Sequence, residues 1–196
     1  MTSPAPSGRN ICVFCGSSSG YDPVYHAAAT ELGQVLADGG HRLIYGGGSV
    51  GLMGVVANTV LEHGGVVTGV ITEQLMAQEI AHTGITRLDV VADMHSRKAR
   101  MAELADGVIV LPGGFGTLDE TFELLTWNQL GLVSTPVVFL DVDQYFQPLF
   151  DFIDRGIAAG FMKPHHGATA QRAHTADGAV ALATAPAPDY QPKWLV

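Results

Sequence analysis

The sequence predicts a Rossmann-like α/β fold, a doubly wound parallel sheet with helices on both faces, in a single domain. Two observations lead to this prediction. Short apolar runs rich in Val, Ile and Leu alternate along the chain with segments of helical length, and three of these runs end in loops rich in Gly and Ser. Because parallel neighbours require crossover connections, strands that alternate with helices indicate a parallel sheet covered on both sides.

The strands are expected where short, mostly apolar runs stand between turn-forming residues. In chain order they are residues 10–15, 41–45, 66–71, 85–91, 108–111 and 136–140. The short length and β-branched content of these runs are typical of strands that are buried in a parallel sheet.

The helices are expected between these strands, and their ends carry recognisable signals. Asp22 can cap the first helix with Pro23 at its first position, Ser49 and Asp93 can cap two others, and Gly131 can end a fourth. The expected helices are residues 23–38, 50–63, 72–76, 94–105, 117–130 and 145–159, with a short one over 177–183 in an otherwise irregular segment from 160 to 196.

Length and charge limit the classes of protein to consider. The chain has 196 residues and a formal net charge of −9. We expect one domain over 10–184, a disordered tail over 1–9 and a C-terminal tail over 185–196. The acidic balance argues against a nucleic-acid partner, since nucleic-acid binders concentrate basic residues on one face. The chain has no run as long as a membrane span and no signal-like start, which predicts no membrane partner and a cytoplasmic location.

The only two cysteines, Cys12 and Cys15, fall at the first strand. Positions three apart in a strand point to opposite faces, which disfavours a disulfide between them. A redox pair would need a helix N-terminus to activate its thiol. We therefore expect two buried structural thiols.

The stretch from Asp106 to Gly131 organises the rest of the chain. An apolar strand, Val108–Leu111, leads into Pro112-Gly113-Gly114-Phe115-Gly116, where missing Cβ atoms let the backbone turn sharply and approach a ligand. Thr117 and Glu120 have the spacing of a capping box at the start of the following helix. A strand, a glycine turn and a helix N-terminus in this order predict an anion site, and the expected anion is a phosphate.

The three loops rich in Gly and Ser are 16–20, 46–51 and 113–116. Each follows a predicted strand, so they can line one crevice at the carboxyl edge of the sheet. None is a GxGxxG motif after the first strand, and no Walker motif with its Lys is present, which argues against NAD, FAD and nucleoside triphosphates. We expect no cofactor. The eight histidines show no metal-binding spacing, and we expect no metal.

Two motifs resemble those of the Lonely Guy family, the cytokinin riboside 5′-monophosphate phosphoribohydrolases. The run from Pro112 to Glu120 matches the PGGxGTxxE signature, and Met94-His95-Ser96-Arg97-Lys98 is similar to the family's Arg-Lys motif. The resemblance extends from about Ile11 to the middle 150s. Ser96 and Phe115 depart from the commonest pattern, in which an acidic or amide residue and a Tyr stand at these positions.

The resemblance implies that Glu120 and Arg97 are catalytic. From the residues alone, Glu120 could serve only as a cap and Arg97 could lie on a solvated helix face. The residues expected to bind substrate are Glu79, Lys98, Gly113, Gly114, Phe115, Gly116, Thr117, Leu118, Asp119, Thr126, Gly16, Ser17, Gly47, Gly48 and Met94. Alternatives stay open for two of these, because Glu79 could be an exposed loop carboxylate and the Thr126 hydroxyl could bond its own helix backbone.

The reaction implied by the resemblance is hydrolysis of the N-glycosidic bond of an N6-substituted adenosine 5′-monophosphate. Cleavage of that bond builds positive charge on the ribose ring. We expect Glu120 to stabilise this charge and to orient or deprotonate the attacking water, and Arg97 to offset negative charge on the departing base. The turn over 113–117 would hold the 5′-phosphate and so align the reacting bond.

Three other functions remain possible at this point. A lysine decarboxylase, an earlier label for the family, would need a Schiff-base Lys in an apolar site, and only Lys98 stands near the glycine loops. A non-catalytic nucleotide sensor would bind AMP without releasing adenine. A broader nucleosidase would accept unsubstituted AMP. Apolar residues in the helices over 94–104 and 118–130, together with the resemblance, predict a homodimer.

Overall fold

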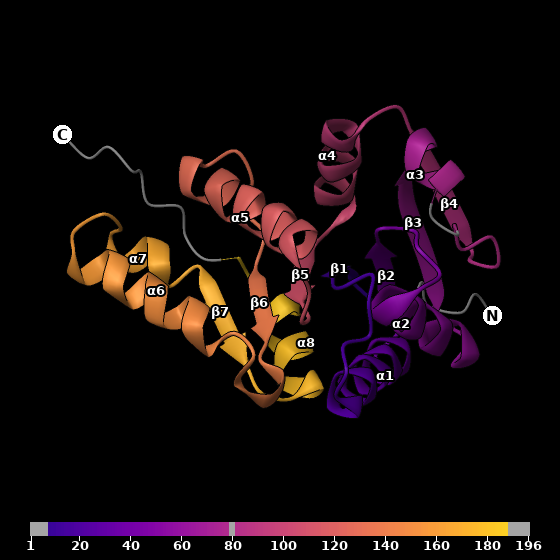
Figure 1. Ribbon diagram of the computed structural model, residues 1–196, viewed down its shortest axis with the longest axis horizontal. Helices are drawn as coiled ribbons and strands as arrows, with labels where there is room; N and C mark the ends of the chain where they lie inside the picture. The colour runs from indigo at the N-terminus through magenta and orange to yellow at the C-terminus, as the bar shows by residue number, and fades with distance from the viewer. Residues whose placement is uncertain (1–7, 79–80, 188–196) are drawn as a thin grey trace, which may run out of the picture.

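The computed structural model describes residues 8–78 and 81–187 of the chain (Figure 1). Its strands are β1 (Asn10–Phe14), β2 (Arg42–Tyr45), β3 (Val66–Thr72), β4 (Arg87–Val91), β5 (Gly107–Val110), β6 (Val137–Leu140) and β7 (Ala170–Ala173). Its helices are α1 (Pro23–Asp38), α2 (Gly51–Glu62), α3 (Glu73–Gln78), α4 (Met94–Leu104), α5 (Phe115–Leu130), α6 (Gln147–Ala158), α7 (Pro164–Gly167) and α8 (Ala176–Thr184), with a 3₁₀ turn η1 (Val142–Gln144) before α6.

All the strands belong to one sheet, in the order β4-β3-β2-β1-β5-β6-β7. Every neighbouring pair is parallel. The buried side chains form two clusters, one on each face of the sheet: one includes residues of α1, α2 and α8, and the other includes residues of α4, α5 and α6. The doubly wound parallel fold that the sequence predicts is confirmed.

The topology creates a crevice beside the central strand. The chain builds outward from β1 to β4 and then returns to β5 on the other side of β1. Helix α1, which follows β1, packs on one face of the sheet, and helix α5, which follows β5, packs on the other. The loops that connect these strands to their helices therefore diverge at the carboxyl ends of β1 and β5 (Figure 1). Ligands of open α/β sheets bind at such a switch point.

The segment after residue 160 is more regular than the sequence indicates. The short helix expected over 177–183 corresponds to α8, but the sequence predicts neither α7 nor the edge strand β7. The sequence of β7, Ala-Gln-Arg-Ala, has no β-branched or aromatic residue, so local preference does not mark it as a strand. Pairing with β6, from Val137 opposite Ala170 to Leu140 opposite Ala173, determines its conformation.

The capping box predicted at Thr117 and Glu120 is wrong. Helix α5 begins two residues earlier, at Phe115, and its N-cap is Gly114, which makes no side-chain capping bond. Thr117 is buried inside the first turn, and the Glu120 carboxylate accepts a hydrogen bond from Arg97. The Thr117 N–H, which a capping box would have bonded to the Glu120 side chain, is therefore left for another partner.

The N-terminal boundary also differs from the expectation. Arg9, which the sequence assigns to the disordered tail, bonds to the sheet: its carbonyl accepts from the Arg42 N–H at 2.9 Å, and its N–H donates to His41 Nδ1 at 3.1 Å. Gly8 is also described, whereas residues 1–7 of that tail and the C-terminal residues 188–196 lie outside the described part of the chain.

Helix α8 packs so closely on β5 that only glycine fits at Gly107. A Cβ added there would lie 2.0 Å from the Ala183 carbonyl oxygen, which is backbone and cannot turn aside. We expect Gly107→Ala to lower the free energy of unfolding by about 2 to 3 kcal/mol, measured by urea denaturation. The matched change Gly156→Ala, in α6 with its nearest neighbour at 3.9 Å, should not destabilise the protein. Equal effects of the two changes would contradict this packing.

Candidate active site

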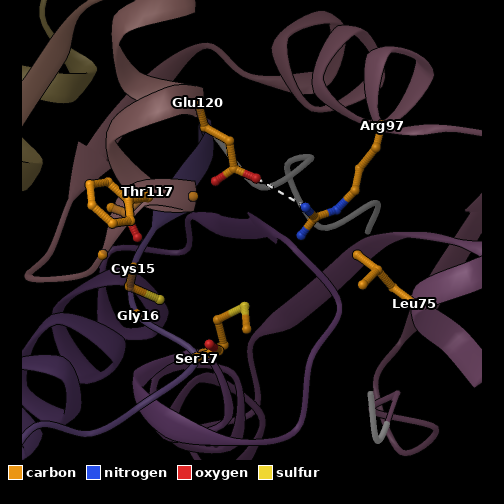
Figure 2. A pocket seen from close by; sticks show the side chains of 11 residues that line it. Cys15, Gly16, Ser17, Leu75, Arg97, Thr117 and Glu120 are labelled. Carbon is orange, nitrogen blue, oxygen red and sulfur yellow. Dashed lines mark hydrogen bonds and ion pairs between the residues drawn. The ribbon is translucent and has the colours of Figure 1, made fainter. Parts of the chain in front are cut away.

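A cavity of about 240 Å³ opens at the switch point between β1 and β5. Its walls come from the loop after β1, from the first turns of α5 and from the inner face of α4 (Figure 2). Glu120 and Arg97 reach into it from α5 and α4 and face one another across its rim. We call this space the Glu120 cavity.

The Arg97 side chain is held at three points. Its Nε donates to the Val70 carbonyl of β3 at 3.0 Å, and its Nη2 donates to the Gly46 carbonyl after β2 at 3.1 Å. Its Nη1 donates to Glu120 Oε1 at 3.1 Å. The arginine side chain is only 8% exposed, and the three bonds leave some of its N–H donors available to a bound molecule.

Glu120 is a nearly buried carboxylate whose charge is only partly compensated. Its side chain is 12% exposed, and one oxygen contacts Arg97 while the other points away from that pair (Figure 2). Burial is the largest influence on the Glu120 pKa and raises it, and the neighbouring Arg97 charge lowers it less, so the pKa stays above its usual value. A raised pKa makes this carboxylate a stronger proton acceptor than an ordinary glutamate.

The start of α5 provides the anion-binding part of the cavity. The first intrahelical bond runs from the Leu118 N–H to the Gly114 carbonyl at 3.1 Å, so the four N–H groups of residues 114–117 have no partner within the helix. All four residues line the Glu120 cavity. Unpaired N–H groups at the positive end of a helix bind phosphate and carboxylate groups.

The loop after β1 forms the opposite wall and is fixed by backbone bonds. The Gly16 N–H donates to the Pro112 carbonyl at 3.0 Å, and the Gly16 carbonyl accepts from the Leu52 N–H at 3.1 Å. The loop therefore joins the start of α2 to the turn after β5. Gly16 and Ser17, both expected to bind substrate, line the cavity together with Gly114, Phe115, Gly116, Thr117, Glu120 and Arg97.

The second glycine loop supports the site from outside the cavity wall. Gly47 and Gly48 are buried, the Gly47 carbonyl accepts from the His82 N–H at 2.9 Å, and Gly48 forms a bridge with Ala81. Gly47 has a φ of 78°, a conformation that favours glycine. Both residues hold the segment after α3, and neither lines the Glu120 cavity.

Lys98 and Asp119, also expected at the substrate, bind one another outside the cavity. Lys98 Nζ lies 3.1 Å from carboxylate oxygens of both Asp119 and Glu123. Burial is the largest single influence on the Lys98 pKa and lowers it, but the bonds from Glu123 and Asp119 together raise it above its usual value. A lysine that stays charged and doubly paired is a poor Schiff-base nucleophile, which argues against a decarboxylase that depends on Lys98.

Four other predicted residues have different surroundings. Leu118 packs against the core, and Gly113 lies behind the cavity wall, where it lines a neighbouring hollow. Met94 is partly exposed, and its sulfur lies 3.9 Å from Arg97 Nη1. The Thr126 hydroxyl donates to the Phe122 carbonyl at 2.7 Å, which is the alternative that the sequence left open for it. Glu79 lies outside the described residues.

Sequence reasoning missed three residues that line the Glu120 cavity: Cys15, Met53 and Leu75. Cys15 directly follows β1 at its carboxyl end, and that position was the available signal. Met53 and Leu75 reach the cavity only through the packing of α2 and α3. Burial raises the pKa of the Cys15 thiol, and the Glu120 charge raises it further, so this thiol stays protonated.

The arrangement combines an anion site, a carboxylate with a raised pKa and an immobilised guanidinium around one small cavity. Such a set can hold a phosphorylated molecule, take up a proton and stabilise charge on a leaving group. Among the described residues, no group of three or more His, Cys, Asp and Glu side chains is placed to hold a metal ion.

Comparison with known proteins gives consistent results. The family model described as "Possible lysine decarboxylase" matches residues 53–183. A probable cytokinin riboside 5′-monophosphate phosphoribohydrolase of Oryza sativa subsp. japonica is 51% identical over 161 residues, which cover 81% of this chain and 72% of that protein. A cytokinin riboside 5′-monophosphate phosphoribohydrolase of Rhodococcoides fascians is 44% identical over 182 residues, which cover 92% of each chain.

Solved structures share the fold at lower sequence identity. The molybdenum cofactor binding protein from Rippkaea orientalis gives a TM-score of 0.68 with 21% identity, over 91% of this chain and 96% of that one. At this identity the likeness concerns the fold alone. The family model spans most of the chain and the sequence relatives share 44% and 51% identity with it, so the chain belongs to the Lonely Guy family of cytokinin riboside 5′-monophosphate phosphoribohydrolases.

Proposed function

We propose that the protein hydrolyses the N-glycosidic bond of N6-substituted adenosine 5′-monophosphates, with free base and ribose 5-phosphate as products. The observation that carries this proposal is the contact of 3.1 Å between Arg97 and Glu120 in a cavity whose other wall is the start of α5. The names of relatives at 44% and 51% identity support the same reaction.

The 5′-phosphate is the anchor of the bound nucleotide. It binds the free N–H groups at the start of α5, where the helix dipole favours negative charge. Glu120 lies further along the same helix, beyond those N–H groups, so a sugar tethered by its phosphate can bring C1′ toward the carboxylate. Binding energy at the unreactive phosphate is thus used to align the reacting bond.

In the reaction, the bond between C1′ and the purine nitrogen breaks as a water oxygen bonds to C1′. The Glu120 carboxylate stabilises the positive charge that develops on the ribose and accepts the proton of the attacking water. The bond electrons leave with the purine, and the Arg97 guanidinium offsets the negative charge there until the base is protonated. Burial of both side chains strengthens these charge interactions.

The walls of the cavity favour a base with an apolar substituent over unsubstituted AMP. Cys15, Met53 and Leu75 form an apolar part of the lining, and Leu75 lies on the side of Arg97 (Figure 2). Burial of an apolar substituent against such a surface contributes about 25 cal/mol per Å². Chromatography of the products from AMP and isopentenyl-AMP, incubated side by side, tests this preference. Equal turnover of both would favour the broader nucleosidase, and binding without release of base would favour a sensor.

Replacement of Glu120 by Gln tests the catalytic assignment. Because the amide cannot accept the water proton or carry a compensating charge, we expect kcat to fall by about 10³-fold or more. Binding of AMP, measured by calorimetry, should persist because the phosphate anchor is intact. The control is Glu123→Gln, one turn along the same helix, which contacts Lys98 and should stay within about threefold of the wild type. Near-normal turnover by Glu120→Gln would refute the assignment.

The raised pKa of Glu120 predicts where activity is lost in acid. Since the ionised form accepts the proton, activity falls as the pH drops through the Glu120 pKa, and burial places that pKa above the ordinary value of about 4.3. Substrate phosphate also titrates near pH ~6. Carbon-13 NMR titration of the Glu carboxyls in the free protein measures the Glu120 pKa without the substrate phosphate. The signal that is missing in Glu120→Gln identifies the Glu120 carboxyl. A Glu120 pKa at or below about 4.3 would contradict the prediction.

We also propose that the protein is a homodimer. Phe122 and Leu130 of α5 and Phe152 of α6 are large apolar side chains that remain exposed in the single chain, and Phe122 borders a groove between α5 and the α6–α7 segment. Burial of such side chains against a second copy would remove apolar surface from water.

Light scattering should give a mass of about twice 20.6 kDa. A charged side chain in the interface is costly, so Phe122→Glu should shift the protein toward the monomer. The exposed Tyr21, in the loop before α1, provides the control change Tyr21→Glu. A monomeric wild type would contradict the proposal.

No helix in the described part of the chain combines the length and apolar content that crossing a bilayer requires. A cytoplasmic location is part of the proposal and can be tested by fractionation of cells that express the protein.

A further inference from the structure

The carbonyl of Gly113 is held by a side chain that the reaction does not use. The hydroxyl of Tyr145, which follows η1, donates a hydrogen bond of 2.7 Å to the Gly113 oxygen. Gly113 is the first of the two glycines in the turn between β5 and α5, and its carbonyl belongs to the same peptide unit as the Gly114 N–H.

The geometry of a peptide links this bond to the anion site. The chain has no cis peptide bonds in its described part, so the N–H of the 113–114 unit points opposite to its carbonyl. With the carbonyl turned to Tyr145, the Gly114 N–H points away from that residue. Gly114 lines the Glu120 cavity and Tyr145 does not, so the bond sets the direction of one of the four free N–H groups at the start of α5.

Packing confines the two residues of this peptide unit unequally. A Cβ added at Gly113 would lie 2.2 Å from Thr117 Oγ1, whereas a Cβ added at Gly114 would meet nothing within 4 Å. Behind the turn lies a second hollow of about 330 Å³, the rear hollow, whose lining includes Tyr25, Gly113, Gly114 and Tyr145. On the Gly114 side the peptide unit therefore has room to rotate, and the bond from Tyr145 holds it in one orientation.

Tyr145 itself is held firmly from the side away from the turn. The buried Asp141 carboxylate accepts from the Phe146 N–H at 2.7 Å and pairs with Arg172 of β7. Between Asp141 and Tyr145 the chain passes through Asp143 and Gln144, whose φ values of 49° and 58° are costly for residues with a Cβ. Such a conformation persists only where its surroundings impose it.

We propose that Tyr145 is a positioning residue for the phosphate site: its hydroxyl fixes the 113–114 peptide so that the Gly114 N–H is directed to the 5′-phosphate. The inference rests on the proposed binding of phosphate at the start of α5. Asp141 and Arg172 act one step further away, because they hold the segment that carries Tyr145.

The test is Tyr145→Phe, which removes the hydroxyl and keeps the ring. The ring packs edge-on against Tyr25, with centroids 5.8 Å apart, and this contact is retained. Loss of one hydrogen bond should raise the KM for isopentenyl-AMP and the inhibition constant of ribose 5-phosphate by about 2- to 10-fold. The kcat and the inhibition constant of adenine, which has no phosphate, should stay unchanged. Tyr25→Phe, the same change in the neighbouring ring, is the control.

Other outcomes would overturn the inference. If Tyr145→Phe changes neither the KM for isopentenyl-AMP nor the inhibition constant of ribose 5-phosphate, the hydroxyl does not orient the site. An equal loss of affinity for adenine, or a fall in kcat alone, would indicate a general structural role. If the wild type releases no base, the proposed reaction fails, but calorimetry of ribose 5-phosphate binding to both proteins still tests the role of Tyr145. Equal affinities in that experiment, or no binding by the wild type, would refute it.

Discussion

The burial of one guanidinium is the constraint on which the site depends. Arg97 is 8% exposed in a chain of net charge −9, and a buried charge is tolerated only when it is paired and hydrogen-bonded. Carbonyls of Val70 and Gly46 and the carboxylate of Glu120 meet this need, and they connect β3, the loop after β2, α4 and α5. A Cβ on Gly46 would lie 2.1 Å from Arg97 Nη2, so the arginine also explains the first glycine of the 46–51 loop.

The same helix serves two groups of opposite charge. Its first turn presents free N–H groups to an anion, and Glu120 stands further along, where the proposed reaction develops positive charge on the ribose. The carboxylate is kept at a raised pKa because burial outweighs the nearby guanidinium. The phosphate requires positive potential and the ribose requires a negative charge. One rigid helix keeps these two requirements apart and fixes the distance between the phosphate and the reacting bond.

The comparison with molybdenum cofactor proteins shows how little the fold alone specifies. The Rippkaea orientalis protein shares the sheet and its switch point with this chain. The switch point provides a crevice in any protein of this topology. The chemistry that this crevice can carry out therefore depends on the side chains that line it, above all the Arg97–Glu120 pair, and not on the topology alone.

The sequence by itself determined the parallel sheet, the glycine turn before α5 and the two motifs that carry Arg97 and Glu120, because apolar periodicity and glycine placement act locally. Tertiary structure decided the rest. The pairing of Glu120 with a residue 23 positions away, in place of a cap on its own helix, is a long-range contact with no local signal. The same is true of β7, of Met53 and Leu75 in the lining, and of the ion pairs with Asp119 and Glu123 that keep Lys98 outside the cavity. Motifs indicate which side chains can react, and only packing determines which of them meet.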